Sequence, residues 1–112
     1  MNTEIQLVTD LKTESTRHVA FNELVSQYKE RLYWHIRHIV KSHDDTDDVL
    51  QNTFLKIYRN IENFKGDSKL FSWMYRIATN EAITFINKRA KQMQITNEEA
   101  QNLAIENMQA DV

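Results

Sequence analysis

Glycine and proline, the residues that most often interrupt helices and mark turns, are nearly absent from this chain. Its 112 residues include one glycine, Gly66, and no proline, and 41% of them are hydrophobic. Strands and tight turns normally depend on those two residue types, so the sequence predicts an all-α fold. A chain this short builds one domain around one modest core.

Apolar residues recur at helical spacing in successive segments, which predicts a compact bundle of three to four helices. We expect a short helix over residues 3–12 and longer helices over 19–42 and 46–63. A turn at 65–68 then leads into a further long helix.

Capping residues indicate where two of these helices begin. Asp45 or Thr46 suits the N-cap of the helix at 46–63, and Asp67 or Ser68 suits the N-cap of the helix that follows. Gly66 precedes that second pair and can adopt the positive φ that a tight turn requires.

Charge is unevenly distributed, although the net charge is only −2. Residues 64–92 hold six Lys or Arg against two Asp or Glu, whereas residues 93–112 hold four Asp or Glu and no Lys or Arg. The helical pattern also weakens after Gln92, so we divide the chain into a helical domain, 1–92, and an acidic linker or tail, 93–112. A basic block beside acidic ones predicts separate surfaces for separate partners and leaves nucleic acid open as one of them.

Several classes of function lack the residues they need. The absence of cysteine excludes disulfides and thiolate metal sites, and no apolar run approaches the roughly 18 residues of a membrane span. The N-terminal segment lacks the basic start of a signal peptide, so we expect a cytoplasmic protein.

Metal-binding and catalytic patterns are also missing. The acidic turn at 44–48 lacks the glycine and the final glutamate of a calcium loop, and His35, His38 and His43 do not form a zinc-binding motif. No nucleophile and base are paired in a known pattern. We therefore expect no metal, no cofactor, no small-molecule substrate and no enzymatic activity.

The stretch 64–92 shows two contrasting helical faces. The face that we expect to be buried is apolar and consists of Phe71, Met74, Tyr75, Ala78, Ala82, Phe85 and Ile86. The opposite face combines one large aromatic with polar and cationic groups: Trp73, Arg76, Asn80, Thr84, Asn87 and Lys91. Cations suit phosphates, whereas an aromatic plane and amide groups suit unpaired bases. With the loop 65–69, whose backbone groups can surround a flipped base, this face predicts a nucleic-acid interface.

An ordinary amphipathic helix, with Trp73 tucked beneath a neighbouring element, explains the same pattern. On the residues alone it is the simpler explanation. Burial of Trp73, Arg76 and Asn80 in the interior, or an inaccessible Gly66 turn, would exclude the nucleic-acid interpretation.

Three motifs in order resemble a known family. They are Asp-Asp-Val-Leu-Gln-Asn-Thr-Phe-Leu-Lys-Ile-Tyr-Arg-Asn-Ile at 47–61, Phe-Lys-Gly-Asp-Ser at 64–68 and Trp-Met-Tyr-Arg-Ile-Ala-Thr-Asn at 73–80. Together they closely resemble the second conserved region of bacterial RNA polymerase sigma factors of the extracytoplasmic-function (ECF) group. The resemblance covers roughly residues 3–92 and implies a bundle of helices that supplies specificity rather than chemistry.

The resemblance implies two binding surfaces. In the family, one helix docks on a coiled-coil clamp of the largest subunit of core RNA polymerase, and the matching positions here are Asp48, Gln51, Asn52 and Leu55. The family usually has Glu where this chain has Asn52, which puts a charge contact at that position in doubt. The other surface recognises and opens the minus-ten promoter element and captures bases of the nontemplate single strand. Its matching positions are Lys65, Gly66, Asp67, Ser68, Lys69, Trp73, Arg76, Asn80, Lys88 and Arg89.

Two expectations concern the wider context. Members of the ECF group carry a further domain for the minus-thirty-five element, and nothing after Gln92 resembles it, so we expect a fragment or a truncated protein. Anti-sigma proteins often hold the family inactive and are a further candidate partner. The competing interpretation is an all-helical interaction module, or a polymerase-binding regulator, that does not read DNA.

Overall fold

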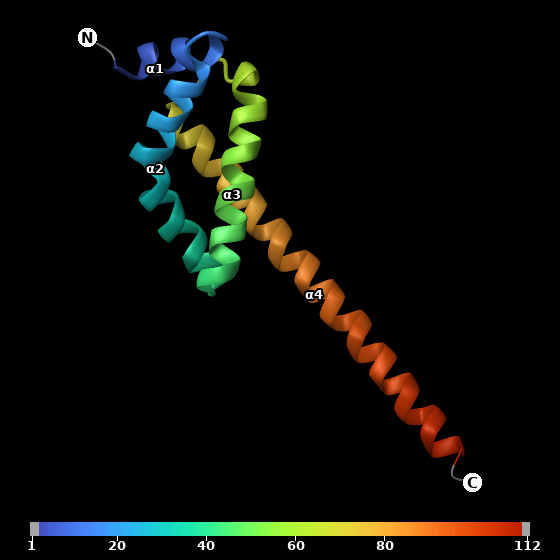
Figure 1. Cartoon of the computed structure of the whole chain (residues 1–112). Helices are drawn as coiled ribbons and strands as arrows, with labels where there is room; N and C mark the ends of the chain where they lie inside the picture. Colours follow the sequence, from blue (N-terminus) through green and yellow to red (C-terminus); the bar gives the residue numbers. More distant parts are fainter. Residues whose placement is uncertain (1–2, 111–112) are drawn as a thin grey trace.

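The computed structural model describes residues 3–110, and over that range the chain is helical with short connections (Figure 1). The elements in chain order are α1 (Thr3–Lys12), α2 (Arg17–Val40), α3 (His43–Asn60), the 3-10 turn η1 (Ile61–Asn63) and α4 (Leu70–Ala110). This confirms the all-α bundle. Residues 1–2 and 111–112, which belong to the predicted domain and tail, lie outside the described residues.

Three helices pack pairwise to form the bundle: α2 and α3 run antiparallel, and the first half of α4 lies against both. α1 crosses the end of α2 beside η1. The second half of α4 leaves the bundle as a single rod, which stretches the molecule to 79 × 24 × 24 Å. In the described part of the chain, no helix has both the length and the apolar character needed to cross a membrane.

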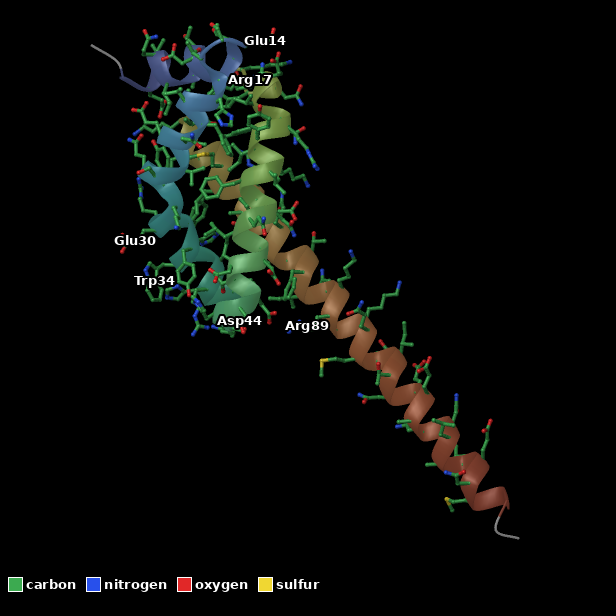
Figure 2. The ribbon with its side chains drawn as sticks, viewed as in Figure 1. Glu14, Arg17, Glu30, Trp34, Asp44 and Arg89 are labelled. Carbon is green, nitrogen blue, oxygen red and sulfur yellow. The ribbon has the colours of Figure 1, made fainter. Side chains whose placement is uncertain are left out.

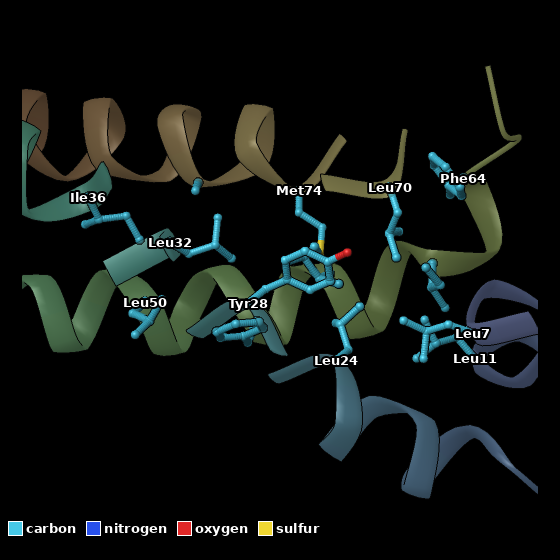
Figure 3. Packing of buried hydrophobic residues seen from close by; sticks show 14 of the residues in the cluster. Leu7, Leu11, Leu24, Tyr28, Leu32, Ile36, Leu50, Phe64, Leu70 and Met74 are labelled. Carbon is cyan, nitrogen blue, oxygen red and sulfur yellow. The ribbon is translucent and has the colours of Figure 1, made fainter. Parts of the chain in front are cut away.

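The core lies between these helices and is built from aliphatic side chains at helical spacing together with the aromatic Tyr28, Phe54 and Phe64 (Figure 3). Fully buried members from α2, α3 and α4 include Leu24, Leu32, Ile36, Val49, Ile57, Leu70, Met74, Ala78 and Ala82. The alanines of α4 bring its backbone close to α2 and α3. α1 adds Leu7 and Leu11 and so closes one end of the core.

The turn between α2 and α3 corrects the predicted start of α3. Lys41 ends α2 in the left-handed conformation, with φ 77°, and the Ser42 hydroxyl then accepts a bond from the Asp45 backbone N–H at 3.4 Å. Ser42 is therefore the N-cap, not Asp45 or Thr46. Thr46 is buried inside the helix, where its hydroxyl donates to the Ser42 carbonyl at 2.6 Å. Serine and threonine are both good caps, so residue type alone does not choose between them.

The buried face of α4 is rotated slightly from the predicted stripe. Met74, Ala78 and Ala82 are buried as expected, and Phe71 and Phe85 are partly buried against the core. Tyr75 and Ile86 are instead exposed. Leu70 and Ile77 pack against the core on the side of the helix away from Tyr75 and Ile86. The buried face of α4 is therefore rotated toward Leu70 and Ile77, and Tyr75 and Ile86 lie at its edge.

The tail predicted as an acidic linker is helical as far as Ala110 in one unbroken continuation of α4. From Ala90 through Met108 every residue is exposed.

Candidate nucleic-acid interface

The loop between η1 and α4 is held open to solvent beside α1. Gly66 has φ 79°, and all five residues from Lys65 to Lys69 are exposed. Together with α1, this loop borders a hollow of about 600 Å³, which we call the loop hollow. Its other lining residues are Glu4, Ile5, Val8, Thr9, Lys12 and Phe64. The hollow thus combines an apolar side with lysines and backbone groups.

Two cationic side chains fix α1 against this loop. Lys12 Nζ donates to the Phe64 carbonyl at 2.5 Å. The Arg17 guanidinium links α1 to η1, because it donates to the Leu11 carbonyl at 3.0 Å and to the Glu62 carboxylate at 2.7 Å. The sequence pattern gave no sign of these contacts, because the partners lie up to 52 positions apart.

α4 begins at Leu70, directly after the loop. The Trp73 backbone N–H donates to the Lys69 carbonyl at 3.2 Å, so Lys69 occupies the capping position that was predicted for Asp67 or Ser68. Asp67, Ser68 and Lys69 are all compatible with a turn, so residue type does not decide among them. The burial of Leu70 sets the start of α4.

Trp73 joins the loop to the core. Its ring is half-buried and tilted against Phe64, with 5.3 Å between the ring centroids. Arg76 and Asn80, on the next two turns, are exposed. Of these three residues, only Trp73 lies partly in the interior, and the Gly66 turn is accessible. Neither of the two observations that would exclude a nucleic-acid interface is therefore made.

Lys88 and Arg89 lie apart from this group. Lys88 is exposed about 12 Å further along the helix axis than Asn80, at 1.5 Å per residue. Arg89 faces α3, where it pairs with Asp45 at 2.6 Å, and its guanidinium lies 4.9 Å from the centre of the Phe85 ring. Figure 2 shows Arg89 near the point where α4 leaves the bundle. A DNA contact for Arg89 remains a prediction that would have to coexist with this ion pair.

A histidine missed as a site residue supports the turn that carries Asn80. The Thr79 hydroxyl donates to the Tyr75 carbonyl at 2.9 Å, so it accepts the 2.7 Å hydrogen bond from His35 Nε2. The His35 ring also stacks on Tyr75 at 3.7 Å. Burial, and secondarily the charge of His38, lowers the pKa of His35 from its ordinary value of 6.5. The sequence pattern does not make His35 a zinc ligand, and nothing in it marks Thr79 as its partner.

A second exposed surface lies on α3. Asp48, Gln51, Asn52 and Leu55 fall on one stripe of the helix and are all exposed. Beside them is a shallow hollow of about 360 Å³ between α3 and α4, where Lys56 pairs with Glu81 at 2.8 Å. Within residues 3–110, no three His, Cys, Asp or Glu side chains converge as metal ligands would.

Comparisons with known proteins agree on one family. Residues 24–92 match the family model described as sigma-70 region 2. The chain is 40% identical over 86 residues to the ECF RNA polymerase sigma-E factor of Haemophilus influenzae, a match that covers 74% of this chain and 45% of that protein. It is also 40% identical over 67 residues to the ECF RNA polymerase sigma-E factor of Escherichia coli K12, covering 60% and 35%. It thus spans less than half the length of these relatives.

A solved structure is similar in fold as well. It is the NMR structure of an engineered region 2 of sigmaE in complex with GTAAAA, with a TM-score of 0.71 and 29% sequence identity. The similarity covers 82% of this chain and 93% of that one. The family match begins at Leu24, so α1, which borders the loop hollow, lies outside it.

Proposed function

The chain belongs to the sigma-70 region 2 family, and on that premise we propose that it acts in transcription initiation as the promoter-recognising part of an ECF sigma factor. In this role it binds core RNA polymerase and recognises and opens the minus-ten element. It contributes binding energy rather than catalysis and acts in the cytoplasm, where the polymerase works.

The observation that carries the proposal is the accessibility of the Gly66 loop together with Arg76 and Asn80. The loop, Arg76 and Asn80 are all accessible to a separated strand, and the family match is what makes them candidates for contacting it. The likeness to a region 2 that was solved with a short oligonucleotide supports the same interpretation.

On the DNA side, we assign base capture to the loop 65–69. Extruding a base costs a few kcal/mol, and contacts to the extruded base offset that cost. Lys65 and Lys69 attract phosphates, which adds an affinity that falls as salt rises. Asn80 offers an amide for base edges. Because the Trp73 ring packs on Phe64, we assign it the support of the loop rather than stacking on a free base.

On the polymerase side, we assign docking to the α3 stripe of Asp48, Gln51, Asn52 and Leu55, on the largest-subunit clamp. Asp48 supplies the negative charge of this stripe, and Leu55 supplies an exposed apolar contact. The family usually has a glutamate at this position, and Asn52 is a neutral amide instead. The contact that Asn52 makes therefore depends on hydrogen bonding rather than on charge. An anti-sigma protein that covers either surface would block initiation.

The test is transcription by core polymerase from a library of minus-ten sequences. Asn80→Ala and Lys69→Ala should abolish promoter opening while polymerase binding is retained. Asn22→Ala and Lys29→Ala, which change the same residue types at exposed positions of α2, serve as controls. Unchanged transcription by the Asn80→Ala and Lys69→Ala variants would contradict the proposal and would favour a polymerase-binding module that does not read DNA.

A further inference from the structure

Helix α1 lines the loop hollow although it lies outside the residues that match the family model, which begin at Leu24. The hollow has the loop 65–69 on one side and α1 on the other. Its volume of about 600 Å³ lies within the roughly 300–1,000 Å³ of sites that bind small organic groups. A group that enters the hollow therefore contacts α1 as well as the loop.

α1 is held firmly enough to be a fixed wall of this site. Its Leu7 and Leu11 side chains are buried in the core. Lys12 Nζ donates to the Phe64 carbonyl at 2.5 Å, and the Arg17 guanidinium joins the end of α1 to η1. A recognition site needs such support, because a wall that moves cannot discriminate between ligands of similar size.

The lining of the hollow is partly apolar and carries charges of both signs. Its apolar lining residues are Ile5, Val8 and Phe64. Its charged lining residues are Glu4, Lys12, Lys65, Asp67 and Lys69. The carboxylates disfavour a free phosphate as the ligand, whereas the apolar part suits the flat faces of a base that has left its stack. The lysines of the exposed loop then suit the phosphates on either side of that base.

Thr9 is the polar residue of α1 that can distinguish one base from another. Its hydroxyl lies 2.8 Å from the Ile5 carbonyl, which can only accept, so the hydroxyl proton is committed to that bond. The Thr9 oxygen therefore meets a ligand in the hollow as an acceptor. Adenine and cytosine carry an amino group, which donates, where thymine carries O4, which accepts. An acceptor at this wall therefore favours adenine or cytosine over thymine.

We propose that α1 forms one wall of the base-capture site and that Thr9 selects adenine or cytosine against thymine at the captured position. This inference rests on the proposed function, because it requires the loop 65–69 to capture a base of the nontemplate strand. It adds a residue outside the family match to those that determine which promoter sequence is opened.

The test first locates the captured position and then varies the base there. 2-Aminopurine, whose fluorescence rises when it leaves the base stack, is placed at each nontemplate position of the minus-ten element in the complex with core polymerase. Initiation is then measured with adenine, cytosine or thymine at the brightest position. The wild type should prefer adenine or cytosine over thymine about fivefold, which is the factor that one neutral hydrogen bond contributes.

Thr9→Val removes the hydroxyl at nearly constant shape and should abolish most of this preference. Thr13→Val is the matched control. Thr13 is also exposed, and its hydroxyl makes the same kind of bond, to the Thr9 carbonyl at 2.8 Å, but Thr13 does not line the hollow. Thr13→Val should therefore keep the preference of the wild type.

The Lys69→Ala variant separates this inference from the function on which it rests. If Lys69→Ala leaves promoter opening intact, base capture by the loop is wrong and the role of α1 is lost with it. If Lys69→Ala abolishes opening but Thr9→Val keeps the preference, only the role of α1 is overturned. Three other results would also overturn it: a wild type that does not disfavour thymine, a Thr9→Val variant that initiates equally less with all three bases, or loss of the preference in Thr13→Val.

Discussion

Arg89 of α4 holds the carboxylate of Asp45, at the start of α3, with both of its terminal nitrogens, at 2.6 and 3.3 Å. The contact is bidentate and ties the last bundle turn of α4 to the first turn of α3. It also lies at the boundary between the part of α4 that is packed and the part that is free.

The first prediction concerns the energy of this pair. A double-mutant cycle with Arg89→Ala and Asp45→Ala should give a coupling free energy of about 0.5–1 kcal/mol, because the pair is bidentate but partly exposed to water. Urea denaturation at low salt measures it, and the coupling should shrink at high salt. Strictly additive effects of the two substitutions would show that the contact does not stabilise the bundle.

Gly66 provides the second prediction. A methyl group placed at its Cβ position would meet nothing within 4 Å, so any cost of Gly66→Ala comes from the backbone. At φ 79° that cost should be about 1–2 kcal/mol in the free energy of unfolding. Gly66→Asn should cost less, because asparagine tolerates the left-handed region better than alanine does. Equal losses for Ala and Asn in urea denaturation would argue against a strained backbone as the cause.

The third prediction separates docking from folding at Leu55. This side chain is 44% exposed on α3. Leu55→Ala should weaken binding to core polymerase about tenfold, or about 1.4 kcal/mol, and should change the free energy of unfolding by less than about 1 kcal/mol. Val19→Ala is the control, since Val19 is 73% exposed on α2, away from the α3 stripe. Equal polymerase affinity for the two variants, measured by fluorescence titration, would remove Leu55 from the docking surface.

Much of this fold could be predicted from the sequence because it depends on local patterns. The near absence of glycine and proline fixed the all-α class, and α1 begins and ends at the predicted residues. The residues at which the helices begin were harder to predict. Ser42 caps α3 although Asp45 and Thr46 are also good caps by type, and the geometry of the preceding Lys41 turn decides among them.

The site was less predictable because its supports are long-range contacts. The turn at 65–68 follows from Gly66 and its polar neighbours, and the outward positions of Arg76 and Asn80 follow from helical spacing. The link from Lys12 to Phe64 and the hydrogen bond from His35 to Thr79 join segments that no periodicity relates. The resemblance implies a DNA contact for Arg89, and only the packing of α4 against α3 reveals its ion pair with Asp45.

The fourth prediction follows from the lowered pKa of His35. Burial makes the folded state bind a proton less readily than the unfolded state, in which the pKa is near 6.5. Stability from this group is therefore complete above 6.5 and is lost as the pH falls through 6.5 toward the lower pKa of the folded state. Urea denaturation of the wild type should therefore give a lower free energy of unfolding about one pH unit below 6.5 than about one pH unit above it.

His35→Gln should reduce this acid sensitivity, because glutamine does not titrate but keeps an N–H that can donate to the Thr79 hydroxyl. His18→Gln removes an exposed histidine near the start of α2 and should leave the sensitivity unchanged. If the wild type and His35→Gln lose the same stability on acidification, the titrating group lies elsewhere. Since His35 holds the α4 turn that carries Asn80, promoter opening by the wild type should weaken over the same pH range, and opening by His35→Gln should weaken less.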